Sequence, residues 1–218
     1  MRSVAGTHYI RDEQGNLVPF EQIYDRYFEP IFHYILHRLA NVADAEDLTA
    51  QTFFKALRGL WKFRWSGVPF SAWLYRIATN EIHSFMRQKG RQRRAGLAEA
   101  PAPETETALA EDSELADAEK KLRQNRLFME LAACIQMLKP EEQALVVLHY
   151  LEQKPYAEIA QILGKRQGTL VMRTHRALKK LKEKLEQRGI DHEEIRASFK
   201  TTAYTGYQGA DIQAEFAP

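Results

Sequence analysis

The feature that most constrains this chain is the segment from Pro69 to Arg94, PFSAWLYRIATNEIHSFMRQKGRQRR, which changes from apolar to basic within one helix length. Its apolar residues recur at intervals of three and four, the spacing that places side chains along one face of an amphipathic helix. These residues are Phe70, Trp73, Leu74, Ile77, Ala78, Ile82, Phe85 and Met86. The segment is therefore predicted to form a long helix with one face in a core, while Arg76, Asn80 and His83 lie on its other faces.

The second half of this segment carries cations and no acidic residue. After Phe85 come Arg87, Lys89, Arg91, Arg93 and Arg94. A phosphate backbone would neutralise such a local excess of positive charge. Nucleic acid is therefore the expected partner, although the formal net charge of the whole chain is only +2.

Two further helices are predicted before this segment. Apolar residues follow helical spacing from Phe20 to Leu39, and a second helix is expected after Asn41, where Asp44 and Glu46 suit the partial positive charge of a first turn. Three such helices have enough apolar surface for a compact bundle. We assign this bundle to residues 20–95 and an N-terminal extension to residues 1–19.

The composition changes sharply after the bundle. Between residues 97 and 119 the chain has eight acidic residues and no Lys or Arg, and Pro101 and Pro103 disfavour helix in its first part. This pattern predicts an extended acidic linker, which we assign to residues 96–125. Two roles stay open for it: spacing with solubility, or mimicry of nucleic acid in a basic channel.

A second helical domain is predicted at residues 126–188. Helical spacing resumes near Leu115, and Pro140 opens a further helix with the sequence EEQALVVLHYL. A C-terminal extension at residues 189–218 carries no motif that we can assign. The predicted fold class is therefore all-α, with two small helical domains joined by the linker.

This second domain ends in the pattern of a helix-turn-helix. A short helix is expected from Pro155 to Leu163, a turn at Gly164, and a longer basic helix from Thr169 to about Leu185. The stripe Leu170, Thr174, Leu178, Leu181 and Leu185 is predicted to be buried. A different face then carries Val171, Met172, His175, Arg176 and Lys179. That face is either solvated or able to enter a major groove, and its place in a helix-turn-helix favours DNA contact.

The composition argues against several other classes. The single cysteine, Cys134, cannot form an internal disulfide, and its helical spacing predicts a buried structural role. The N-terminus lacks the apolar segment of a secretory signal, and apolar runs stop well short of a membrane span. We therefore expect a cytoplasmic protein without membrane insertion.

The sequence gives little support for an enzyme. It contains no glycine-rich phosphate loop, no HExxH and no paired cysteines, so no catalytic residue and no cofactor is predicted. His33 and His37 lie four residues apart on one helix and could ligate a metal, but no third ligand is evident. No metal site is therefore predicted.

Together these motifs resemble the small bacterial sigma factors of the extracytoplasmic-function (ECF) group. DAEDLTAQTFFKAL at residues 44–57 is similar to the family's core-binding helix, and WLYRIATN at residues 73–80 to its promoter-melting segment. GTLVMRTHRALKKL at residues 168–181 is similar to its upstream-element recognition helix. The resemblance covers roughly residues 20–94, like region two, and 126–185, like region four.

The resemblance implies RNA polymerase core and promoter DNA, both duplex and melted, as partners, and an anti-sigma protein as a further one. Core polymerase binding would fall to Asp44, Glu46, Asp47 and Gln51. Promoter melting and binding of the minus-ten element would fall to Trp65, Phe70, Trp73, Arg76, Asn80, His83, Arg87, Lys89 and Arg91. Binding of the minus-thirty-five element would fall to Lys165, Arg166, Thr169, Val171, Met172, Arg173, His175, Arg176 and Lys179.

Some positions depart from the family pattern, and one other class stays open. Ala50 and Gln51 stand where the family usually has glutamine and glutamate. Polymerase binding is therefore expected to depend more on Asp47. Val171 replaces a usual Lys or Arg, which alters the expected promoter sequence. The alternative is a helix-turn-helix regulator that binds duplex DNA without polymerase and uses its N-terminal bundle for dimerisation or sensing.

Overall fold

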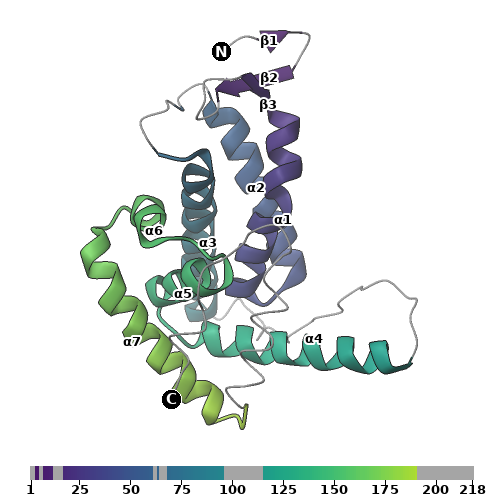
Figure 1. Ribbon diagram of the computed structural model, residues 1–218, viewed down its shortest axis with the longest axis vertical. Helices are drawn as coiled ribbons and strands as arrows, with labels where there is room; N and C mark the ends of the chain where they lie inside the picture. The colour runs from purple at the N-terminus through teal and green to yellow at the C-terminus, as the bar shows by residue number, and fades with distance from the viewer. Residues whose placement is uncertain are drawn as a thin grey trace.

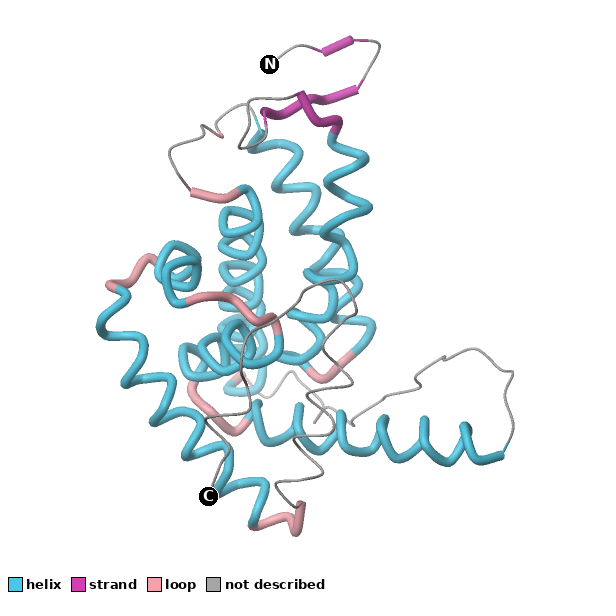
Figure 2. Tube along the Cα trace, viewed as in Figure 1, coloured by secondary structure: helices cyan, strands magenta, loops and turns pink. Residues whose placement is uncertain are grey.

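The computed structural model of the 218-residue chain describes residues 3–4, 7–11, 17–60, 63, 68–95 and 115–190. An N-terminal unit contains α1 (Phe20–Leu39), α2 (Val42–Gly59) and α3 (Phe70–Arg94). A C-terminal unit contains α4 (Leu115–Gln136), α5 (Pro140–Val146), η2 (Val147–Leu151), α6 (Tyr156–Leu163) and α7 (Gln167–Glu186). Figures 1 and 2 show the two units packed side by side, with α6 next to α3 and α7 along the outer edge.

The N-terminal unit has the three helices that the apolar periodicity predicts. Asn41 caps α2, since its Oδ1 accepts a hydrogen bond of 2.8 Å from the backbone N–H of Asp44. The core between the helices is formed by Ile31, Ile35, Leu48, Phe53, Leu74, Ala78 and Ile82. This packing fixes the orientation of α2 and α3, and with it the outward faces of both helices.

The C-terminal unit has the helix-turn-helix pattern that the sequence predicts. Gly164 ends α6 with φ +64°, a left-handed conformation that glycine adopts without the steric cost of a Cβ. Pro140 opens α5, where its missing N–H would have had no intrahelical partner. Cys134 is buried, as predicted.

Two predicted boundaries need correction. The single helix expected for EEQALVVLHYL ends as the π-helical turn η2, in which the N–H of Glu152 donates to the carbonyl of Val147 at 2.9 Å. Helix α4 begins at Leu115, where helical spacing is predicted to resume, so the correction is to the range assigned to the linker, whose residues 115–125 are helical. The rest of that range, 96–114, lies outside the described residues.

Short strands precede the helices and were not predicted. Strands β1 (Ser3–Val4), β2 (Thr7–Arg11) and β3 (Leu17–Pro19) pair antiparallel in the order β1-β2-β3, with Ile10 opposite Val18. They lie at the start of α1 (Figure 1). The all-helical class is confirmed for the two units that follow.

The two units share a continuous apolar core. Helix α3 packs against α6, and α1 packs against α4 and η2. Buried Arg38 contributes to this contact from α1, donating from Nη1 to the Tyr34 hydroxyl and from Nη2 to the carbonyl of Pro140, both at 3.0 Å. Within the part of the chain that the structure describes, none of the helices has the length and apolar character of a transmembrane segment.

Candidate nucleic-acid and polymerase interfaces

Acidic and amide side chains predicted for polymerase binding lie on the outward face of α2. Glu46, Asp47 and Gln51 are exposed. Asp44 is half-buried instead, and its Oδ2 lies 2.6 Å from the Nζ of Lys89 on α3. Asp44 thus differs from the three exposed residues, because its carboxylate forms an ion pair between α2 and α3.

The same face of α2 carries an apolar side chain that the sequence analysis did not single out. Phe54 is 59% exposed, and the Arg58 guanidinium lies 5.6 Å from the centre of its ring. Its spacing from Asp47 and Gln51, seven and three residues, places it on their side of the helix. That spacing from Asp47 and Gln51 is the signal in the sequence that could have identified Phe54.

Polar residues predicted for promoter binding form a stripe along α3. Arg76, Asn80, His83, Arg87 and Arg91 follow one another at intervals of four, three, four and four, and all five are exposed. Partial burial and, to a lesser extent, the charge of Arg38 lower the pKa of His83 below its usual value, while Glu141 opposes this effect. His83 is therefore neutral near pH 7, so its ring can both donate and accept a hydrogen bond.

Lys89 lies off this stripe. Besides its ion pair with Asp44, its ammonium is 4.6 Å from the centre of the Phe85 ring. These contacts turn it toward α2 and away from the line of exposed cations. A phosphate contact by Lys89 would require both to break.

The aromatic residues predicted to bind melted DNA pack against one another. Phe70 is only 8% exposed, whereas Trp73 is half-buried, and their ring centres are 5.2 Å apart. Phe63 lies 5.1 Å from the Trp73 ring and 5.3 Å from Phe70. A Cβ on Gly59 would approach the Trp73 ring to 3.2 Å, so the absence of a side chain there makes room for the indole. Trp65 lies outside the described residues.

Helix α7 presents the two faces that its periodicity predicts. Leu170, Thr174, Leu178, Leu181 and Leu185 are buried. Met172, His175, Arg176 and Lys179 are exposed, and Val171 is half-buried. Lys165, Arg166 and Thr169, at the start of the helix, are also exposed.

Glutamates at the start of α5 neutralise part of this basic surface. Arg173 Nη1 lies 2.7 Å from Glu141 Oε1, and Lys165 Nζ lies 3.7 Å from the same oxygen. Lys180 forms an ion pair with Glu142. The two carboxylates thus occupy positions between cations that phosphate groups could take instead.

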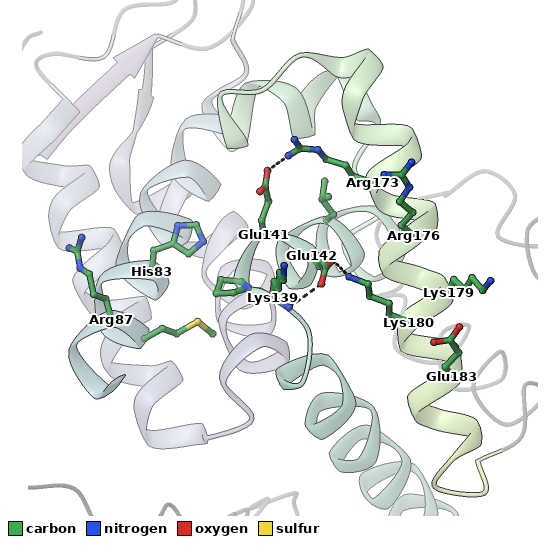
Figure 3. Close-up of a pocket in the computed structure, with 13 residues that line it drawn as sticks. His83, Arg87, Lys139, Glu141, Glu142, Arg173, Arg176, Lys179, Lys180 and Glu183 are labelled. Carbon is green, nitrogen blue, oxygen red and sulfur yellow. Dashed lines mark hydrogen bonds and ion pairs between the residues drawn. The ribbon is translucent and has the colours of Figure 1, made fainter. Parts of the chain in front are cut away.

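The predicted DNA-contact faces of the two units border the same cavity, of about 1180 Å³. Figure 3 shows His83 and Arg87 of α3 on one side and Arg176 and Lys179 of α7 on the other, with Glu141 between them. Cations outnumber acids in its lining. The cavity is therefore a solvent-open, anion-attracting space between the units.

His33 and His37 do not form a metal site in the part of the chain that the structure describes. No group of three or more His, Cys, Asp or Glu side chains that could hold a metal occurs there. His37 is 2% exposed, and its Nδ1 lies 2.6 Å from the carbonyl of His33. Burial lowers the pKa of His37 to about 4, so its ring is neutral at physiological pH.

Comparison with known proteins finds two family models along the chain. The model for sigma-70 region 2 matches residues 23–92, and the model for sigma-70 region 4 matches residues 128–181. The RNA polymerase sigma factor YlaC of Bacillus subtilis is 30% identical over 165 residues, which cover 76% of this chain and 91% of YlaC. The chain therefore belongs to the family of RNA polymerase sigma factors.

Within this family the similarity is to the extracytoplasmic-function group. The ECF sigma factor BldN of Streptomyces coelicolor is 31% identical over 172 residues, which cover 78% of this chain but only 62% of BldN. This chain thus spans less than two thirds of the length of BldN. The fold is also that of the sigma factor RpoE from Bartonella quintana, solved with the anti-sigma factor NepR, at a TM-score of 0.60, 23% identity, and coverage of 77% of this chain and 96% of RpoE.

Proposed function

We propose that this chain is a sigma factor that binds RNA polymerase core, recognises promoter DNA and helps to melt it. The observation that carries this proposal is the presence of region 2 and region 4 matches on two units, each with a basic outward stripe on one helix. A helix-turn-helix regulator that acts without polymerase would account for α7 but not for the region 2 match. The role proposed here is in transcription initiation, not in catalysis.

Each proposed binding role is assigned to an exposed face of one helix. Asp47, Glu46 and Gln51 would contact polymerase through the acidic face of α2, and Phe54 would add apolar area at the edge of that contact. The α3 stripe would hold the melted strand, because exposed arginines bind phosphates and the Asn80 amide can hydrogen-bond a base edge. The outward face of α7 would read duplex DNA in the major groove.

The proposed domain boundaries are 20–95 for the region-two-like unit and 126–188 for the region-four-like unit. The family matches, at 23–92 and 128–181, fall within these ranges. We propose a cytoplasmic location because polymerase and promoter DNA are there. An anti-sigma protein is a further proposed partner, since RpoE, which shares this fold, was solved with one.

Replacing Asn80 with alanine is expected to reduce promoter opening about fivefold, because loss of one hydrogen bond to an unpaired base corresponds to roughly 1 kcal/mol. Closed-complex formation should remain unchanged, since duplex contacts are made elsewhere. Permanganate reactivity of unpaired thymines measures opening. Gln88→Ala removes another exposed amide from α3 and serves as the control. Normal opening in the Asn80 variant would assign its side chain no part in melting.

Replacing Arg176 with alanine is expected to weaken recognition of the upstream promoter element by about 1–3 kcal/mol, because the side chain lies at the centre of the exposed α7 face. Promoter-specific transcription by reconstituted holoenzyme measures the effect. Lys184→Ala removes a cation from the same helix outside that face and serves as the control. Equal transcription by the Arg176 variant and the parent would show that a different face of α7 reads DNA.

A further inference from the structure

The outward face of α7 carries a large apolar side chain among its polar residues. Met172 is 59% exposed, whereas Leu170 and Thr174, two residues to either side of it, are buried. Two residues correspond to a rotation of about 200° around an α-helix. Met172 therefore lies on the side of α7 opposite the core, on the helix that forms the outer edge of the molecule (Figure 1).

A single exposed apolar side chain is common on protein surfaces, so exposure alone does not indicate a binding role. The position of Met172 is more specific. It lies three residues after Thr169, four before Arg176 and seven before Lys179, and all three are exposed. These spacings place the four side chains on one face of the helix. Met172 is thus at the centre of the face proposed to read duplex DNA.

The position of Met172 along the helix matters as well. Helix α7 begins at Gln167, so Met172 belongs to its second turn. In helix-turn-helix proteins the residues near the start of the second helix contact base edges in the major groove. Met172 therefore lies where bases are read, one turn before Arg176.

Polar side chains around Met172 are engaged within the protein. Arg173 Nη1 lies 2.7 Å from Glu141 Oε1 on α5, and Lys165 Nζ lies 3.7 Å from the same oxygen. The Thr169 hydroxyl donates to the carbonyl of Arg166 at 2.8 Å, so its donor is used inside the turn. The thioether of Met172 is thus the group that this turn of α7 presents outward.

Val171 is the other apolar residue in this turn, and it is placed differently. It is half-buried and precedes Leu178 by seven residues, a spacing that puts both on the same side of the helix. Leu178 is buried, so Val171 lies at the edge of the core. Met172 therefore presents more apolar surface to a partner than Val171 does.

The chemistry of methionine limits what Met172 can recognise. Its side chain has no N–H or O–H donor, and its sulfur is only a weak acceptor. Guanine, adenine and cytosine edges in the major groove present donors or acceptors, which an apolar group would deprive of water without replacing the hydrogen bonds. Thymine presents a C5-methyl group there, and an unbranched, flexible thioether packs readily against it.

We propose that Met172 reads a thymine in the upstream promoter element through apolar contact with its C5-methyl group in the major groove. The proposal rests on the proposed function, which supplies the duplex. It goes further by assigning one kind of base to one side chain. Arg176 and Lys179, one and two turns later on the same face, then contact guanine edges or phosphates on the C-terminal side of this base.

The test begins with holoenzyme reconstituted from polymerase core and the full chain. Duplexes of random sequence are enriched by repeated binding to this holoenzyme, which defines the upstream element. Each thymine of that element is then replaced in turn by deoxyuridine, which lacks the methyl group and keeps the same hydrogen-bonding edge. At one position the replacement should weaken binding about fourfold, equivalent to about 0.8 kcal/mol for one buried methyl group.

A Met172→Ala variant links this effect to the side chain. Because more than half of Met172 is exposed, its truncation leaves the core of the C-terminal unit intact. In the variant holoenzyme the deoxyuridine replacement should change affinity by less than about 1.5-fold, since the group that contacts the methyl is gone. Met137→Ala is the matched control. Met137 is similarly exposed, at 55%, but lies just after α4, and its variant should keep the fourfold effect.

The outcomes separate this inference from the proposed function. An enriched element in which no thymine methyl contributes to affinity, or in which the contribution persists in Met172→Ala, would overturn the inference and leave promoter recognition in place. A holoenzyme that enriches no sequence would reject the proposed function, and this inference with it.

Discussion

Asp47→Arg is expected to weaken binding to RNA polymerase core by at least about a hundredfold. Asp47 is exposed on α2 beside Glu46 and Gln51, so its carboxylate can face a basic surface of the partner without rearrangement. Charge reversal replaces an attraction by a repulsion between like charges, which costs several kcal/mol in an interface. Fluorescence anisotropy of labelled protein titrated with core enzyme measures the change.

The matched control for this variant is Asp25→Arg on α1. Asp25 is also an exposed carboxylate of the N-terminal unit, so its reversal changes the net charge equally but lies outside the α2 face. Its affinity for core should stay within about threefold of the parent, because an isolated surface charge contributes less than about 1 kcal/mol. Unchanged binding by Asp47→Arg would show that α2 does not contact polymerase through this residue.

His37 is expected to make folding sensitive to acid by about 3 kcal/mol between neutral pH and pH 4. Burial lowers its pKa from 6.5 to about 4, and each unit of difference corresponds to about 1.36 kcal/mol. Above pH 6.5 this contribution to stability is fully present. As the pH falls toward 4, only the unfolded state takes up the proton, and the free energy of unfolding decreases.

Comparison with His37→Leu isolates this effect. Glu152 titrates in the opposite sense, because its raised pKa favours the folded state as the pH falls from 7 toward 4.5, but it does so equally in both proteins. Urea unfolding across the pH range should therefore show the parent losing about 3 kcal/mol relative to the Leu variant on acidification. Parallel curves for the two proteins would mean that His37 does not titrate differently in the folded state.

The helices of both units could be predicted from sequence because each has a strong apolar period. In α3 the stripe from Phe70 to Ile82 marks the face that packs on α1 and α2. It does not reveal that Tyr75 and Glu81, off the stripe, are buried as well. Those residues are buried because specific partners satisfy them, Glu152 for Tyr75 and Lys55 for Glu81, and periodicity carries no information about partners.

The exposed part of the candidate site could also be predicted from the sequence. Helical spacing alone places Arg76, Asn80 and His83 on one side of α3, and Arg176 on the outward side of α7. The packing between the units was not predictable in this way. It depends on contacts such as Arg38 to Pro140, 102 positions apart, which no local pattern encodes.

The most direct test of the central claim is whether the protein binds RNA polymerase core and directs it to a promoter. The protein is expressed with an affinity tag, core enzyme is sought in the purified fraction, and the reconstituted complex is assayed for promoter-specific transcription against core alone. A sigma factor should co-purify with core, and its specific DNA binding should depend on core because the two DNA-reading units must be positioned together. Specific duplex binding by the isolated protein, with no association with core, would contradict this account and identify a regulator of the helix-turn-helix class.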